Sequence, residues 1–234
     1  MTVLGFDTAG GDTSVCALAE GEVLHESLVG PSERSAPLHT AALLGEVEAA
    51  VAAAGGWGAI ERIAVGIGPG TFTGLRIGIA TARALAFARG LPLSGVGTLD
   101  TLARGLGEAA GERRRLAVLD ARRGEVFAAC YSVAGEQLWG PLVCPPEALA
   151  ERLGAAQATL AAGSGAVGFR QHLTIRGVEI PDDADPVHRI AARHACALAA
   201  AAPSEDDSAS VAPIYLRPPD AERWRERDSL QKAG

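Results

Sequence analysis

The stretch GPGTFTGLRIG, residues 68–78, decides the fold of this chain. An apolar run, 60–68, predicts a strand before it, and a helical pattern follows it as far as Gly90. Glycines on both sides of Pro69 allow a tight turn, and a threonine after them can cap the helix. No lysine follows Gly74, so this is not a P-loop, and a structural turn is favoured over a phosphate cradle. The loop consists of Gly68, Pro69, Gly70, Thr71, Phe72 and Thr73.

The pattern on both sides of this loop predicts a duplicated α/β fold. A shorter version of the first half's order begins near Leu116, and residues 186–202 predict one further helix. Mixed sheets with helices on both faces are the natural packing of such an order. The elements predicted for the first half are three strands, a helix, a strand, a helix, a strand and a helix, at 2–8, 13–20, 21–29, 32–55, 60–68, 75–90, 91–97 and 98–111.

Two lobes follow from this duplication. We expect a first lobe over 1–110, a smaller second lobe over 111–219, and a polar, flexible tail over 220–234. The arrangement resembles the two-lobed fold of the actin, sugar kinase and Hsp70 (ASKHA) superfamily. A shared fold does not by itself fix a function.

Composition narrows the functional classes. The chain has 234 residues and a net charge of −7, so it does not carry the overall basic charge of a primary nucleic-acid binder. No apolar run approaches the length of a membrane span, and no secretory signal is visible at the start, so we expect a cytoplasmic protein without a membrane partner. The four cysteines are widely spaced, which favours small buried side chains over a metal site or a disulfide.

Four strings of sequence carry a family resemblance. The loop at 68–78, with ATARALAFARGLPLSGVGTLDTLA at 80–103, closely resembles the signature region of the TsaB family, also called YeaZ. LDARRGEVFAACY at 119–131 resembles that family's second marker. VLGFDTAGGDTSVCAL and PIYLR, at 3–18 and 213–217, resemble its opening strands and its C-terminal ending, so the resemblance covers nearly the whole chain.

The resemblance implies a non-catalytic scaffold. Such a subunit is required, with TsaD and the ATPase TsaE, to form the threonylcarbamoyl group on adenosine 37 of tRNAs that read codons beginning with A. The resemblance further implies a heterodimer with TsaD, a possible homodimer when the subunit is alone, and contact with tRNA only through the complex. The resemblance implies no intrinsic cofactor, with ATP and metal on the partner subunits.

An active enzyme of the same fold is the alternative. In a kinase, Asp7 at the end of the first strand would hold Mg²⁺ through water, with Thr8 and Thr13 near phosphate and Asp120 as the counterpart in the second lobe. Such residues are also ordinary turn and cap residues, and two arginines fill the second turn. A metal-dependent transferase like TsaD would need an H-x-x-x-H pair, and no two of the five histidines have that spacing.

A stripe of small residues marks the expected partner surface. The helix after the signature loop is apolar nearly all round, which predicts a covering on more than one side. Small side chains at every fourth position would let a second helix, from TsaD, approach closely. The alternative is a helix buried in its own lobe. The expected interface residues are Gly74, Leu75, Gly78, Ile79, Ala82, Leu85 and Ala86.

Overall fold

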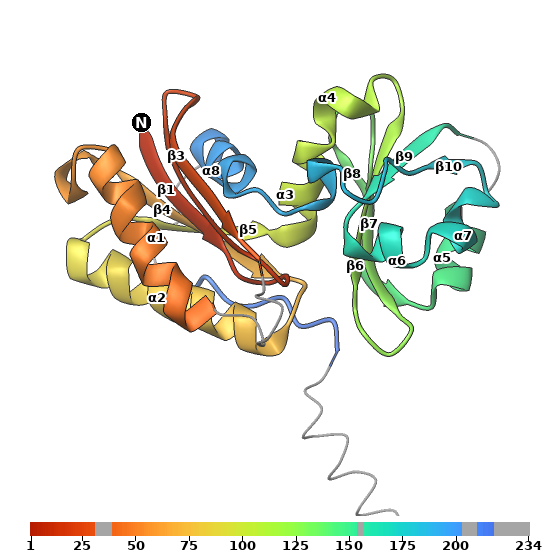
Figure 1. The fold of residues 1–234 in the computed structure, drawn as a ribbon, viewed down its shortest axis with the longest axis horizontal. Helices are drawn as coiled ribbons and strands as arrows, with labels where there is room; N and C mark the ends of the chain where they lie inside the picture. The colour runs from red at the N-terminus through yellow and green to blue at the C-terminus, as the bar shows by residue number, and fades with distance from the viewer. Residues whose placement is uncertain (31–38, 154–156, 203–209, 218–234) are drawn as a thin grey trace, which may run out of the picture.

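The computed structural model describes residues 1–30, 39–153, 157–202 and 210–217. It consists of two lobes, each built on a five-stranded mixed sheet (Figure 1). The strand orders are β3-β2-β1-β4-β5 and β10-β9-β6-β7-β8. In each sheet the first three strands in sequence pair antiparallel, and the remaining two add in parallel. The second lobe therefore repeats the topology of the first, as the sequence predicts.

The elements of the first half come in the predicted order, but the helix expected at 98–111 is divided into two, and residues 32–38 of the helix expected at 32–55 lie outside the described residues. The first half consists of β1 (Thr2–Asp7), β2 (Thr13–Ala19), β3 (Glu22–Val29), α1 (His39–Ala53), β4 (Arg62–Gly68), α2 (Phe72–Arg89), β5 (Leu93–Gly97), α3 (Thr98–Gly105) and α4 (Gly107–Ala110). The second consists of β6 (Arg114–Asp120), β7 (Val126–Tyr131), β8 (Gln137–Cys144), α5 (Pro146–Leu153), β9 (Thr159–Ala162), α6 (Ser164–Gly168), α7 (Arg170–Thr174), β10 (Val178–Glu179) and α8 (Ala192–Ala201).

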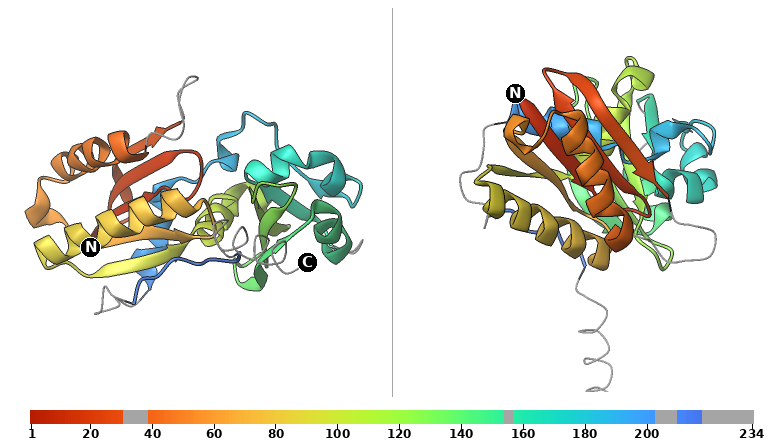
Figure 2. Two further views of the ribbon diagram at one scale, coloured as in Figure 1. Left: turned by 90° about the horizontal axis from the view of Figure 1, so that it is seen from below. Right: turned by 60° about the vertical axis from the view of Figure 1, so that its left-hand side comes forward.

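Helices cover both faces of the first sheet. Helices α1 and α2 run side by side across one face, and α8 lies on the other (Figures 1 and 2). Helix α3 lies between the lobes, and its leucines, Leu99 and Leu102, belong to the core of the second lobe. Among the described residues, no helix is both long and apolar enough to cross a membrane.

The last helix differs from the prediction in its start and in its place. The expected helix over 186–202 begins only at Ala192, because the Ser14 hydroxyl accepts a hydrogen bond from the Ala192 N–H at 2.8 Å and so caps it from another strand. Residues 186–188 form a separate 3₁₀ turn. The helix then packs on the first sheet, where the Arg62 guanidinium donates to the carbonyl of Ala202 at 2.9 Å.

The expected division at residue 110 therefore needs a correction. It separates the two sheets, but the region 111–219 is not one lobe, because α8 and Val211 both pack against the first sheet. The Ile214 N–H also bonds the Ile67 carbonyl at 2.8 Å, which attaches the chain beyond α8 to β4. The predicted tail, 220–234, lies outside the described residues.

Candidate functional site at the ends of the first strands

Asp7 ends β1 inside the protein, with 1% of its surface exposed. Its Oδ1 accepts a hydrogen bond from the Ala9 N–H at 2.7 Å, and its Oδ2 accepts one from the Thr98 hydroxyl at 2.9 Å. The Thr98 oxygen accepts in turn from the Gly68 N–H at 3.2 Å. A side chain on Gly66 would overlap the carboxylate, so β4 closes over it. The Asp7 carboxylate thus ties β1 to the signature loop and to α3.

Burial governs the ionisation of this carboxyl. Loss of hydration raises the pKa of Asp7, while the hydrogen bonds from Ala9 and Thr98 lower it by a smaller amount. Both oxygens already accept hydrogen bonds from the protein's own donors. The residue that would hold a water-bound magnesium ion in a kinase therefore serves here as an internal acceptor.

The two candidate phosphate-side threonines are also paired internally. The Thr8 hydroxyl donates to the Gly74 carbonyl at 2.7 Å and so links the end of β1 to α2. The Thr13 oxygen lies 2.8 Å from Nδ1 of His39 at the start of α1. Burial lowers the pKa of His39, against smaller opposing effects from Gly10 and Asp12. His39 is 3% exposed, and no spacing in the sequence indicates its contact with Thr13.

The signature loop, residues 68–73, packs onto the end of β1. The Thr71 N–H donates to the Ala9 carbonyl at 2.8 Å, and a Cβ atom on Gly70 would lie 2.5 Å from the same oxygen. Only glycine permits this approach of two backbones. Thr71 occupies the N-cap position of α2, as predicted for one of the two threonines, but its side chain makes no capping hydrogen bond.

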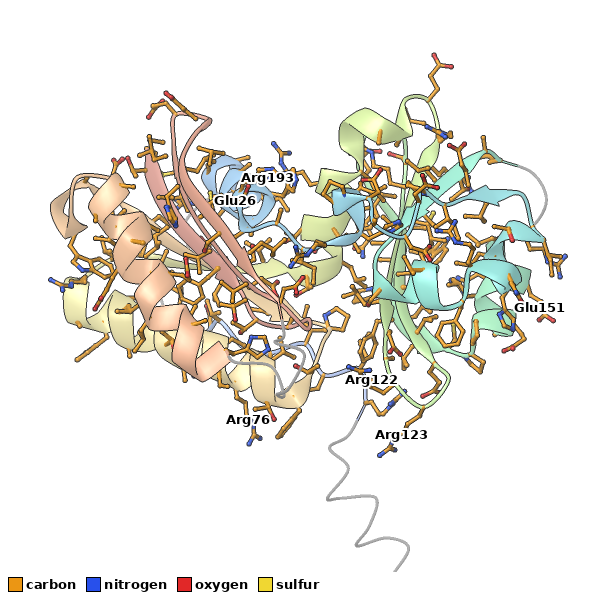
Figure 3. All side chains as sticks on the ribbon, in the orientation of Figure 1. Glu26, Arg76, Arg122, Arg123, Glu151 and Arg193 are labelled. Atoms are coloured by element: carbon orange, nitrogen blue, oxygen red, sulfur yellow. The ribbon has the colours of Figure 1, made fainter. Side chains whose placement is uncertain are left out.

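The second lobe repeats this turn with a different outcome. Asp120 ends β6, and its Oδ1 accepts a hydrogen bond from the Arg122 N–H at 2.7 Å. Asp7 likewise accepts a hydrogen bond from the N–H two residues further along the chain, that of Ala9. The Asp120 carboxylate is open, with 33% of its side chain exposed. Arg122 and Arg123 both have left-handed backbones, with φ of 63° and 58°, and project from the turn (Figure 3). Arginines therefore stand where a phosphate would need small residues.

The small-residue stripe of α2 faces its own sheet, not the solvent. A side chain on Gly74 would overlap the Thr8 carbonyl, and a Cβ atom on Gly78 would lie 2.5 Å from the Thr8 hydroxyl. The stripe lets α2 lie close to β1 and β4, so its assignment to a partner surface is wrong. Leu85 is half-buried beside the same core. The expected interface residues that are buried in this way are Gly74, Leu75, Gly78, Ile79, Ala82 and Ala86.

The other face of α2 is exposed. Phe87 is 89% exposed, and Ala80 and Ala84 also face solvent. On the neighbouring helix α1, Leu44 is 54% exposed. Within the described part of the chain, no group of three or more histidine, cysteine, aspartate or glutamate side chains is placed to hold a metal ion.

Comparisons with known proteins agree with this geometry. The family model described as "TsaD: tRNA N6-adenosine threonylcarbamoyltransferase" matches residues 29–182. A protein of Escherichia coli strain K12, named tRNA threonylcarbamoyladenosine biosynthesis protein TsaB, is 37% identical over 158 residues, which are 65% of this chain and 66% of that protein. A second relative, an uncharacterised protein of Mycobacterium tuberculosis, is 34% identical over 94% of this chain and 93% of its own.

Two solved structures are similar to this chain over most of its length. A hexokinase of the ROK type from Thermus thermophilus, only 14% identical, superposes with a TM-score of 0.52 over 84% of this chain and 98% of its own, and it shows the two-lobed actin and sugar kinase fold alone. YeaZ from Pseudomonas aeruginosa superposes with a TM-score of 0.76 and 31% identity, over 92% of this chain and 99% of that one. The chain therefore belongs to the TsaB (YeaZ) family.

Proposed function

We propose that this protein is a non-catalytic scaffold subunit in the formation of threonylcarbamoyladenosine in tRNA. The names of its relatives support a part in threonylcarbamoyladenosine formation. The hydrogen bonds of Asp7 are the observation that supports a non-catalytic role. An ATP-dependent enzyme of this fold needs that carboxylate for magnesium. Here its two oxygens bind Ala9 and Thr98 instead, and the matching turn of the second lobe holds Arg122 and Arg123.

In this proposal the scaffold acts by binding TsaD, with TsaE joining the pair. The outer face of α1 and α2 is the proposed contact, because Leu44 and Phe87 are exposed there without packing on the chain's own core. Large exposed apolar side chains gain most from burial in an interface. ATP and metal bind the partner subunits, tRNA is reached through the complex, and the same face forms homodimers when TsaD is absent.

One substitution tests this surface. Phe87→Glu should abolish co-elution with the cognate TsaD, because a charge replaces an apolar side chain in the proposed contact. The matched control is Ile175→Glu, since Ile175 is 82% exposed on the second lobe. The control should bind TsaD as the natural protein does. Equal binding by both variants would show that the contact lies elsewhere.

A reconstituted reaction tests the non-catalytic role separately. The purified protein, incubated with threonylcarbamoyl-adenylate and tRNA, should give no threonylcarbamoyladenosine until TsaD and TsaE are added. Product from this protein alone would contradict the proposal. Calorimetry that showed micromolar, Mg²⁺-dependent ATP binding to the lone subunit would instead favour the kinase alternative.

A further inference from the structure

A two-part groove lies between the lobes, away from the strand ends described above. One part, of about 270 Å³, is lined by β5, α8 and the first turn of α3. The other, of about 300 Å³, is lined by α3, the start of β6, the end of β7 and the hairpin that follows it. Asp100 and Leu198 line both parts, so the two volumes adjoin. The groove is at the opposite end of β6 from Asp120, near α3 and α8 in Figure 1.

The first part is lined mainly by backbone and apolar groups. Ser94 lies in its wall and is 6% exposed, but its Oγ is itself buried and makes no hydrogen bond with a described residue. The rest of this part is formed by glycine backbone and apolar side chains, including Val96 and Leu198.

The second part contains two arginines beside a carboxylate. Arg104 is exposed and makes no hydrogen bond or ion pair with a described residue. Arg115 donates from one Nη to the Val133 carbonyl at 2.8 Å and makes no ion pair with a described residue. The Tyr131 hydroxyl donates to Oδ1 of Asp100 at 2.6 Å and holds that side chain between the two parts. Oδ2 of Asp100 has no hydrogen bond with the described residues.

We propose that this groove binds a small zwitterion, an α-amino acid, with its carboxylate at Arg104 and Arg115 and its ammonium group at Asp100. A ligand with only a negative charge would bring its charge close to the Asp100 carboxylate, which disfavours a plain anion. A zwitterion satisfies both signs of charge. Its side chain then extends into the part lined by Ser94 and Leu198. Because α3 belongs to the core of the second lobe and α8 packs on the first, the ligand bridges the lobes.

Calorimetric titration of the full chain with each common amino acid tests the site. At least one should bind with a Kd below about 1 mM. The N-acetyl derivative of that amino acid, which lacks the ammonium group, and its amide, which lacks the carboxylate, should each bind at least about tenfold more weakly. The absence of binding by any amino acid, or equal binding of the N-acetyl derivative, overturns the proposal.

Variants locate the binding on the molecule. Arg104→Gln should weaken the same titration by about tenfold or more. Arg176→Gln is the control, since Arg176 is an exposed arginine of the second lobe that does not line the groove, and it should bind normally. Thermal melts confirm that the variants fold, and Arg104 is a surface residue whose replacement leaves the core intact. Unchanged binding in Arg104→Gln overturns the assignment. No TsaD is present, so the result is independent of the proposed function.

Discussion

Asp7 and Asp120 end the first strands of the two lobes and make the same hydrogen bond to the N–H two residues ahead. Yet Asp7 is 1% exposed, whereas 33% of the Asp120 side chain is open to solvent. The helix that follows the parallel strand differs as well, since α2 has 18 residues and α6 has 5. The comparison teaches that the local turn comes from the nearby sequence, while the burial of the aspartate depends on segments that pack over it later in the chain.

The largest expected effect comes from breaking the close contact that covers Asp7's strand. Gly74→Ala places a methyl group on the Thr8 carbonyl, so the free energy of unfolding should fall by about 3 kcal/mol or more. The matched control is Gly45→Ala in α1, where no described atom lies within 4 Å of the new methyl group. That change should raise the free energy by about 0.5–1 kcal/mol. Urea unfolding of both variants measures the difference, and a stable Gly74→Ala protein would contradict the packing of α2.

The next effect compares the two aspartates directly. Asp7→Ala leaves the Thr98 hydroxyl and the Ala9 N–H without their acceptor, so we expect a loss of about 2 kcal/mol. Asp120→Ala removes an exposed side chain and should cost less than about 1 kcal/mol. Midpoints of urea unfolding give both values. Equal losses would mean that burial does not distinguish the two turns.

A smaller effect concerns pH. Desolvation raises the folded-state pKa of Asp7 above its unfolded value, so the folded state binds the proton more tightly. The stability that this carboxyl contributes is then fully present below the unfolded pKa and is lost as the pH rises through the folded pKa. Relative to Asp7→Asn, the natural protein should lose free energy of unfolding across that window. If the free energy of unfolding changed with pH in the same way in both proteins, Asp7 would not be the group that causes the change.

The smallest effect concerns the turn of the second lobe. Arg122 has φ of 63°, a conformation that costs a non-glycine residue about 1–2 kcal/mol. Arg122→Gly removes that cost but gives the unfolded chain more freedom, which leaves a net gain of about 0.5 kcal/mol. A rise in melting temperature is the readout. A fall would show that the Arg122 side chain stabilises the turn more than its backbone conformation strains it.

The order of strands and helices could be predicted from the sequence for the first half. Which neighbour each face of a helix contacts could not be predicted. Small residues at Gly74 and Gly78 recur in the same way whether a helix approaches its own sheet or a partner's helix. The structure shows that the close neighbour is Thr8, more than sixty residues earlier in the chain. The period alone carries no information about which neighbour is present.

The partners of the candidate site residues could not be predicted for a similar reason. The sequence indicates that Asp7 ends a buried strand, but its partner Thr98 is 91 residues away. The start of α8 depends on Ser14, 178 residues earlier, and apolar spacing before Ala192 predicted a longer helix. Contacts of such separation fix the role of a polar residue, and no local pattern encodes them.

The return of α8 makes the first lobe a discontinuous domain, with the second lobe inserted in it. During synthesis the strands β1 to β5 leave the ribosome first, and the whole second sheet, which ends at Glu179, follows before α8 appears. Until then the apolar side chains that α8 covers, including Val3, Ala64 and Val96, have no cover from that helix. The lobe whose synthesis begins first is therefore completed last, and throughout that interval its uncovered apolar face favours aggregation.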